Sequence, residues 1–122
     1  MMTPTPFRRG DIWVVDFVPA RGHEQDGRRP AVIVSVDTFS NGPAALLAVL
    51  PITRADRRQS LHVAVHPPEG GLRIDSYILC DQVVTVGHGR MLQHWGRLSA
   101  ATMREVDDRL RTVLGLYYYS DT

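Results

Sequence analysis

The stretch LLAVLPIT, residues 46–53, is an apolar run that ends on the hydroxyl-bearing side chain of Thr53. Its length and branched residues predict a buried strand. Pro51 has no amide hydrogen to give to a ladder, so we expect it at a sheet edge, at a bulge or near a strand end. Outward from this run, the same criteria predict strands over residues 10–18, 31–36, 61–66 and 76–86, the last bent or bulged near Asp81.

The end of the chain has the pattern of a helix instead. Ser99 is a suitable N-cap for residues 100–116, because its hydroxyl can accept an amide hydrogen of the first turn. Apolar residues then recur at helical spacing and form one stripe, Met103, Val106, Leu110, Val113 and Leu114. Short, closely spaced strands followed by one helix predict a mainly β protein with a C-terminal helix, as a small closed antiparallel barrel or sandwich.

Length and composition bound the class of protein. The chain has 122 residues, which suits one domain over residues 1–122, with residues 1–8 as a loose tail. Cys80 is the only cysteine, so no intrachain disulfide can form. The N-terminal region lacks an apolar run long enough for a signal peptide or a membrane span, and we expect a cytoplasmic protein without membrane contact.

The basic residues are of one kind. All fourteen are arginines, and the formal net charge is only +1. This small net charge argues against a large surface that binds nucleic acid nonspecifically. It remains compatible with a local groove of arginines. Each of these side chains is a planar fork that matches phosphate or carboxylate geometry.

The loop ARGHEQDGRRP, residues 20–30, concentrates hydrogen-bonding side chains ahead of a predicted strand. Arg29 precedes Pro30, which favours an extended backbone and holds Arg29 where a flexible loop meets a rigid sheet. Two interpretations of Arg29 remain open. Its guanidinium can bind a phosphate, or it can form a solvated ion pair with Glu24 or Asp26.

Several other residues also allow a structural and a functional interpretation. Thr53 is either a donor to an anionic oxygen or an ordinary strand-end residue. Asp81 lies inside an apolar run, where a carboxylate must be paired, solvated in a cleft or shifted in pKa, so a structural ion pair and a catalytic role are both open. Cys80 has the setting of a small buried apolar residue rather than a nucleophile. The basic loop of residues 54–60 is either solvated or part of a cationic groove.

A metal site is not expected from the histidines. His62 and His66 lie four residues apart on a predicted strand, which separates them by about 13 Å at about 3.3 Å per residue. One metal ion cannot bridge that distance.

The motifs GDIW, GHEQ-x-G-x-RP, PIT and CDQ follow one another in this order between about Arg9 and Leu116. In this order the chain closely resembles the MazF/PemK-like toxins of toxin–antitoxin systems. The resemblance implies a small SH3-like barrel of the CcdB/PemK type with a C-terminal helix, assembled as a homodimer. It also implies a metal-independent endoribonuclease that needs no cofactor and cuts single-stranded RNA, including mRNA, at short sequences.

The implied reaction is attack of the ribose 2′-OH on the adjacent phosphate, which gives a 2′,3′-cyclic phosphate and a 5′-OH. The implied protein partner is a cognate antitoxin whose disordered acidic segment blocks the RNA groove. Through that antitoxin, the toxin–antitoxin complex would bind operator DNA.

The site residues follow from the motifs one by one. Arg29 matches the arginine before the family proline, and Thr53 matches the threonine of PIT; these two are the expected catalytic pair. His23 of GHEQ and Asp81 of CDQ are candidates to take the 2′-OH proton. The expected RNA-binding residues surround them and are Glu24, Gln25, Arg28, Arg54, Arg57, Arg58 and Gln82.

One position departs from the PemK branch of the family. An arginine stands there just before the cysteine of CDQ, whereas this chain has Leu79. The proton-transfer roles of that branch therefore cannot be assigned unchanged to this chain. We expect the catalytic roles to fall to Arg29 and Thr53 instead. Two other functions remain as alternatives, a CcdB-like toxin that binds DNA gyrase without cleaving anything and an inactive RNA-binding barrel. The GHEQ…RP and PIT motifs, which CcdB-like proteins lack, disfavour the first.

Overall fold

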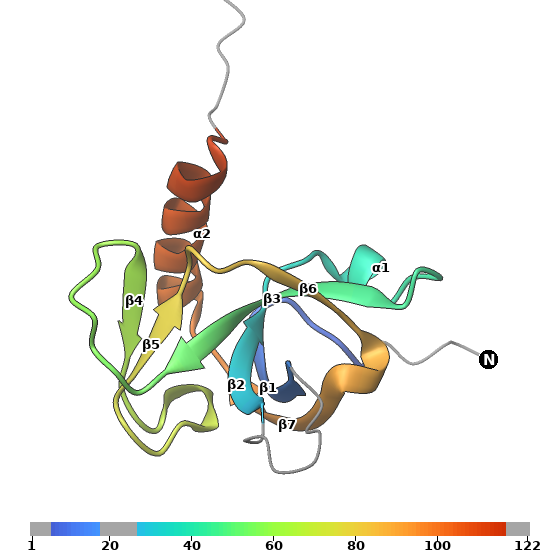
Figure 1. The fold of residues 1–122 in the computed structure, drawn as a ribbon, viewed down its shortest axis with the longest axis horizontal. Coiled ribbons are helices and arrows are strands. Elements are labelled where there is room, and N and C mark those ends of the chain that lie inside the picture. Colours follow the sequence, from blue (N-terminus) through green and yellow to red (C-terminus); the bar gives the residue numbers. More distant parts are fainter. Residues whose placement is uncertain (1–5, 18–26, 117–122) are drawn as a thin grey trace, which may run out of the picture.

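The computed structural model of the chain describes residues 6–17 and 27–116 (Figure 1). The seven strands form one antiparallel sheet, and a single long helix lies at the C-terminal end. The elements in chain order are β1 (Asp11–Asp16), β2 (Arg28–Ile33), α1 (Asp37–Ser40), β3 (Leu46–Thr53), β4 (His62–Val65), the 3-10 turn η1 (Glu69–Gly71), β5 (Ser76–Leu79), β6 (Val84–Gly87), the 3-10 turn η2 (His88–Arg90), β7 (Met91–Arg97) and α2 (Ala100–Leu114).

The strand β3 is the centre of the sheet. The strand order is β4–β5–β3–β2–β1–β7, and β6 pairs with β3 as well. On one edge β3 pairs with β6 through residues 46–49 and with β5 through Ile52 and Thr53. Pro51 lies in the gap between these two ladders. The strand is therefore central rather than an edge, and the change of partner accommodates a residue that has no amide hydrogen.

Two predicted strands differ from the observed ones. The expected strand over residues 76–86 is two strands, β5 and β6, because the chain turns at Cys80 and Asp81 and the two parts pair with different segments of β3. The strand β7 was not predicted. None of its seven side chains is buried, so it lacks the apolar alternation by which a strand is recognised.

The predicted closed barrel is open along one seam. In the part of the chain that the structure describes, no ladder joins β4 to β7. The turn η1, which follows β4, covers this seam by packing on β7. A Cβ added to Gly71 would lie 2.4 Å from the carbonyl oxygen of Trp95, and one added to Gly96 would lie 2.5 Å from the carbonyl carbon of Gly70. Only residues without side chains allow the two backbones to come this close.

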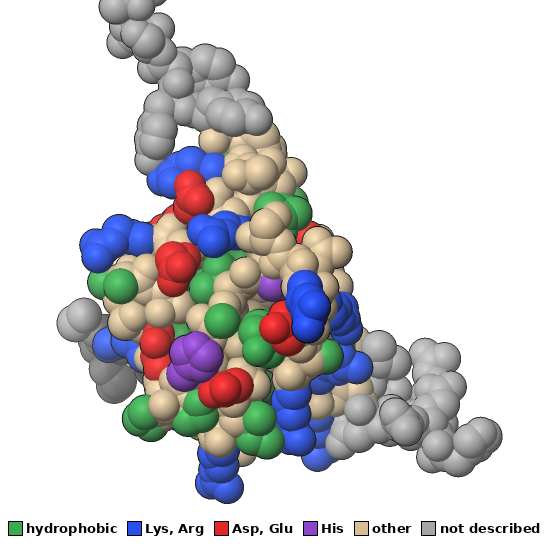
Figure 2. All heavy atoms as spheres, turned by 90° about the vertical axis from the view of Figure 1, so that its left-hand side faces the viewer, with side chains coloured by type: hydrophobic (Ala, Val, Ile, Leu, Met, Phe, Trp, Pro, Cys, Tyr) green, Lys and Arg blue, Asp and Glu red, His purple; other side chains and the backbone are tan. Residues whose placement is uncertain are grey.

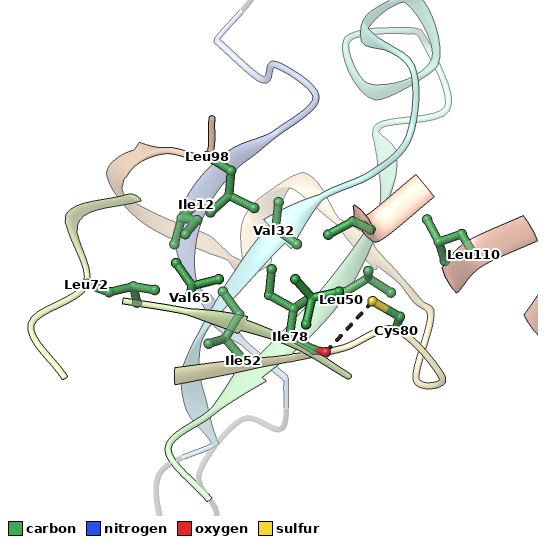
Figure 3. Packing of buried hydrophobic residues seen from close by; sticks show 12 residues of the cluster. Ile12, Val32, Leu50, Ile52, Val65, Leu72, Ile78, Cys80, Leu98 and Leu110 are labelled. Carbon is green, nitrogen blue, oxygen red and sulfur yellow. Dashed lines mark hydrogen bonds between the residues drawn. The ribbon is translucent and has the colours of Figure 1, made fainter. Parts of the chain in front are cut away.

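The hydrophobic core consists of two clusters on opposite faces of the sheet. Within β2, Val32 belongs to the cluster beneath α2, while its neighbours Ala31 and Ile33 belong to the other. A strand covered on both faces needs apolar residues at consecutive positions, which explains the unbroken runs in the sequence. Figure 3 shows the cluster on the α2 side, where Val32, Leu50 and Ile78 lie near Leu110 of the helix. Each fully buried aliphatic side chain stabilises the fold by about 1.5–3 kcal/mol.

The helix α2 begins where the sequence predicts, but it ends at Leu114, two residues before the predicted end at residue 116. The Ser99 hydroxyl accepts a hydrogen bond from the Thr102 amide at 3.1 Å, and Gly115 ends the helix with a φ of 67°. Val106 and Leu110 pack on the sheet, but Leu114 is 54% exposed because the last turn projects beyond the strands (Figure 1). Among the described residues, no helix has the length and apolarity that crossing a membrane requires.

The N-terminal segment is anchored from residue 7 onward. Phe7 is buried and packs against Trp13 and His88 at ring-centroid distances of 5.2 and 4.7 Å. Its backbone exchanges two hydrogen bonds with the Asn41 side chain. Phe7 is therefore not part of a loose tail, and residues 1–5 lie outside the described part of the chain.

Candidate functional site

A cleft of about 930 Å³ opens at one end of the sheet. It lies where β2 begins and β3 ends, and it is bounded on other sides by the segment after η1 and by β7. The described residues that line it are Arg28, Arg29, Pro30, Ile52, Thr53, Arg54, Ala55, Gly71, Leu72, Arg73, Ile74, Ser76, Gln93, His94 and Trp95.

The pairing of β2 with β3 brings Arg29 and Thr53 to one place. The ladder between the two strands ends at the pair Ala31–Pro51. Arg29 lies two residues before Ala31 and Thr53 two residues after Pro51, so both lie at the same end of the paired strands, and both line the cleft. Arg29 lies inside β2 rather than in the loop where we expected it, so its backbone is held by the ladder to Val15 of β1.

The hydroxyl of Thr53 is oriented by the chain that follows it. The amide of Ala55 donates a hydrogen bond to the Thr53 Oγ1 at 3.2 Å. Because one lone pair of the oxygen is engaged in this way, the hydroxyl hydrogen remains able to donate to another group. The side chain is partly exposed and lines the cleft, so an anionic oxygen can reach it.

The cleft has a strongly positive character. Four arginines, at positions 28, 29, 54 and 73, are among the described residues that line it, and no aspartate or glutamate is among those residues. Arginine side chains also gather at the lower right of the face shown in Figure 2. Two exposed apolar side chains accompany the positive charge, Ile74 at 48% and Trp95 at 41% exposure. The cleft therefore suits a ligand that has both phosphates and flat apolar groups.

Two irregularities in β7 shape the far wall of the cleft. Ile12 of β1 pairs with Gly96 while Trp13 pairs with His94, so Trp95 is an extra residue on β7, and a second shift occurs near Leu92. In a regular strand only alternate side chains face one side. Here three consecutive residues, 93–95, line the same cleft. Bulges are known to redirect side chains in this way.

The structure separates Asp81 from this cleft. Asp81 Oδ1 lies 3.0 Å from His62 Nε2, and the His62 side chain is only 5% exposed. β5 pairs with the end of β3 through Tyr77 and Ile78, and it then leads away from Thr53 toward Asp81. Asp81 therefore contacts His62 and is not among the described residues that line the cleft. Gln82 follows it in the same turn.

The other predicted binding residues divide into three groups. Arg28 and Arg54 line the cleft with Arg29 and Thr53. Arg57 and Arg58 are exposed in the loop after β3 and are not among its lining residues. The remaining three, His23, Glu24 and Gln25, lie outside the described residues.

Sequence reasoning missed the polar and aromatic lining residues outside β2 and β3, among them Arg73, Gln93, His94 and Trp95. The stretch QHW has no periodicity of its own, and its only signal is an aromatic side chain beside a histidine in a polar segment. That signal is weak without knowledge of the bulges in β7.

The residues next to Asp81 are part of the core. Leu79 is 1% exposed, and Cys80 is fully buried. Burial raises the pKa of the Cys80 thiol to about 12, so this side chain is a neutral thiol near pH 7. It behaves as the small apolar residue that the sequence indicated.

His62 of β4 and His66, which follows this strand, contact separate carboxylates. His62 contacts Asp81, and His66 Nδ1 lies 3.0 Å from Asp75 Oδ1. Within the described ranges, no three His, Cys, Asp or Glu side chains are grouped closely enough to hold a metal ion.

The comparison with known families decides what kind of protein has this cleft. Residues 8–114 match the model of the PemK-like, MazF-like toxins of type II toxin–antitoxin systems. The chain belongs to this family. The resemblance inferred from the motifs is therefore confirmed, and the match favours a MazF-like toxin over the CcdB-like alternative.

Individual MazF proteins resemble the chain over nearly its whole length. Endoribonuclease MazF9 of Mycobacterium tuberculosis (strain ATCC 25618 / H37Rv) is 34% identical over 115 residues, which cover 90% of this chain and 98% of MazF9. An endoribonuclease from a mycobacterial species, solved in complex with its cognate antitoxin, is 25% identical with a TM-score of 0.71 and covers 96% of this chain and 100% of its own.

A MazF from Deinococcus radiodurans, solved with MazE, is 25% identical with a TM-score of 0.77, over 94% of this chain and 100% of that MazF. These likenesses confirm the predicted fold class, a mainly antiparallel β protein with one C-terminal helix. In this MazF-like chain, Arg29 of the RP motif and Thr53 of the PIT motif line one cleft, whereas the CDQ motif lies outside that cleft.

Proposed function

We propose that the cleft binds single-stranded RNA and cuts it by attack of a ribose 2′-OH on the adjacent phosphate. The chain belongs to a family of toxins, and its relative MazF9 is an endoribonuclease. The protein is accordingly an endoribonuclease toxin of a toxin–antitoxin system. The observation that supports the chemistry is the presence of Arg29 and Thr53 together in a cleft whose described lining has no acidic side chain.

The residue types suit the transition state of this reaction. Attack by the 2′-oxygen gives a phosphorane with extra negative charge on its nonbridging oxygens. The Arg29 guanidinium and the Thr53 hydroxyl can donate hydrogen bonds to those oxygens, and such bonds strengthen as the charge develops. Arg29 stays protonated in a protein, so its role is electrostatic stabilisation rather than proton removal.

The lining also suits a single strand. Positive side chains can follow the phosphates, while the exposed Trp95 ring offers a surface on which an unpaired base can stack. DNA lacks the 2′-OH nucleophile, so DNA can bind but cannot be cut by this route.

Cleavage is expected to be independent of metal ions and to leave a 2′,3′-cyclic phosphate. The reason is that the nucleophile is part of the substrate and the charge is stabilised by side chains. The measurement is digestion of a long mixed-sequence RNA in EDTA, with analysis of the end groups. A substrate with 2′-deoxyribose at the cleaved position is the control and is expected to resist. Activity that disappears in EDTA and returns with magnesium would contradict the proposal, and sequencing of the cut ends would give the cleavage motif.

The same cleft is proposed to receive an acidic, disordered segment of a cognate antitoxin, because arginine forks match carboxylates as well as phosphates. Two of the related endoribonucleases were solved with an antitoxin. We also propose a homodimer, since Leu114 and Leu116 are more than half exposed. Contact with operator DNA would run through the antitoxin.

A synthetic acidic segment of the antitoxin is expected to inhibit RNA cleavage in proportion to its occupancy. Light scattering at micromolar toxin is expected to give the mass of two chains. RNA cleavage that continues undiminished with the segment bound would refute the shared site, and a strictly monomeric mass would refute the dimer.

A further inference from the structure

The cleft has donors for the transition state, but Arg29 and Thr53 supply no base. Arginine does not release its proton in proteins, and a threonine hydroxyl is not basic near neutral pH. Among the described residues that line the cleft, His94 is the only side chain whose neutral form offers a basic nitrogen lone pair. His94 was not among the residues that the motifs indicated.

The surroundings of His94 define which ring nitrogen carries the hydrogen. His94 Nε2 lies 3.2 Å from Asp11 Oδ2 and 3.1 Å from the carbonyl oxygen of Gly96. A carboxylate and a carbonyl can only accept, so Nε2 must be the donor in the neutral ring. The lone pair is then on Nδ1, which has no hydrogen-bond partner within the described part of the chain.

Asp11 is suited to hold this arrangement. Its side chain is only 7% exposed, and Arg97 Nη1 donates a hydrogen bond to its other carboxylate oxygen at 2.7 Å. The buried carboxylate is thus paired with Arg97 through one oxygen and reaches the imidazole through the other. A carboxylate behind an imidazole keeps the required tautomer and stabilises the ring once it is protonated.

The backbone and a neighbouring ring also position the imidazole. The bulge at Trp95 allows His94 and its neighbours to line the cleft together. The Trp13 ring packs against the His94 ring at a centroid distance of 5.4 Å. The histidine is therefore held on three sides while 48% of its side chain remains exposed.

We infer that His94 is the general base of the cleft and that Asp11 is its positioning residue. The inference rests on the proposed function, because it names the group that accepts the 2′-OH proton. In the step, the 2′-OH proton moves to His94 Nδ1 as the 2′-oxygen forms its bond to phosphorus. The bond from phosphorus to the 5′-oxygen breaks, and the 5′-oxygen takes a proton from solvent. The imidazolium then returns its proton to water.

The charged groups around His94 come from several elements. Asp11 of β1 and Arg97 of β7 contact each other beside it, and Arg8 lines the small hollow that His94 shares with both. The arginines of the main cleft, at positions 28, 29, 54 and 73, face it from the other side. Bound RNA phosphates would offset these positive charges.

The variant His94→Gln tests the inference. Glutamine keeps a donor that can reach Asp11 but has no basic nitrogen. The single-turnover cleavage rate is expected to fall about a hundred- to ten-thousandfold. The dissociation constant of a 2′-O-methyl RNA, which cannot be cut, is expected to stay within about threefold of the wild-type value. His66→Gln is the matched control, since His66 is an exposed histidine that does not line the cleft.

The pH dependence of the wild-type rate provides a second test that needs no variant. The rate is expected to rise with pH and then to level off, because a general base acts in its unprotonated form. Asp11→Asn is expected to lower kcat with little change in RNA affinity, because the carboxylate that holds the imidazole and stabilises it once protonated is gone. A purely structural role of Asp11 would not confine the effect to kcat.

Added imidazole is expected to restore part of the rate of His94→Ala and none of the rate of Arg29→Ala. A folded His94→Gln protein that cuts RNA within about threefold of wild type would overturn the inference and leave the proposed function standing. So would a wild-type rate that does not change with pH. A wild-type protein that cuts no RNA would instead overturn the proposed function, and this inference with it.

Discussion

Arg29→Ala is expected to reduce the single-turnover rate of RNA cleavage about a hundred- to a thousandfold while leaving the fold intact. Loss of one preorganised donor to a developing oxyanion raises the barrier by about 3–4 kcal/mol. The fold should persist because the Arg29 side chain is exposed at the mouth of the cleft, and its backbone stays in the ladder of β1 and β2. Arg29→Lys should restore little, since a point charge cannot reproduce the fork.

Substitutions of Thr53 test the second proposed hydrogen-bond donor in the same cleavage assay. Thr53→Val removes the hydroxyl at nearly constant shape and should slow cleavage, whereas Thr53→Ser should retain part of the rate. Arg104→Ala is the matched control, because Arg104 is an exposed arginine of α2 that does not line the cleft. Thermal melts exclude unfolding. Near wild-type turnover by a folded Arg29→Ala protein would refute the proposed site. It would favour the alternative in which this cleft only binds its ligand.

Gly71→Ala is expected to have the largest effect on stability, lowering the free energy of unfolding by about 2–5 kcal/mol. The φ of Gly71 is 77°, which costs a residue with a Cβ about 1–2 kcal/mol. The new Cβ would also lie 2.4 Å from the Trp95 carbonyl oxygen, so η1 and β7 must move apart, and such overpacking typically adds about 1–3 kcal/mol.

The control for this change is Gly89→Ala. A Cβ at Gly89 meets nothing within 4 Å, so the free energy of unfolding of the Gly89→Ala protein should stay within about 0.5 kcal/mol of the wild-type value. Urea unfolding of the three proteins measures the difference. Because Gly71 also lines the cleft, the folded fraction of Gly71→Ala should bind RNA less well. Equal stability of Gly71→Ala and Gly89→Ala would show that the seam between η1 and β7 tolerates separation.

Much of the local structure could be predicted because its causes lie close together in the sequence. Alternation over residues 61–66 predicts which side chains of β4 are buried, and Val63 and Val65 are indeed in the core. The start of α2 follows from the hydroxyl of Ser99, which acts within one turn, whereas the end of the helix before Gly115 was not predicted. The exposure of Leu114 could not be predicted, since it depends on where the sheet ends beneath α2.

The candidate site could be predicted in part. The motifs identify Arg29 and Thr53, and the structure places both in one cleft. The same motifs suggested Asp81 beside them, but β5 leads Asp81 away to His62. A motif records which residues accompany one another in a family, and it does not state the distance between them in a given chain.

The sequence by itself determined the family, the alternation and unbroken apolar runs of the strands, and the N-cap of the terminal helix, because all of these depend on residue identity and short spacings. Only the tertiary structure decided that Arg29 and Thr53 line one cleft, that β5 and β6 are separate strands, and that His94 of the bulged β7 contacts Asp11 and lines the same cleft. Each of these depends on the register between strands distant in the chain. Register is set by packing of both faces of the sheet at once, and no local pattern in the sequence encodes it.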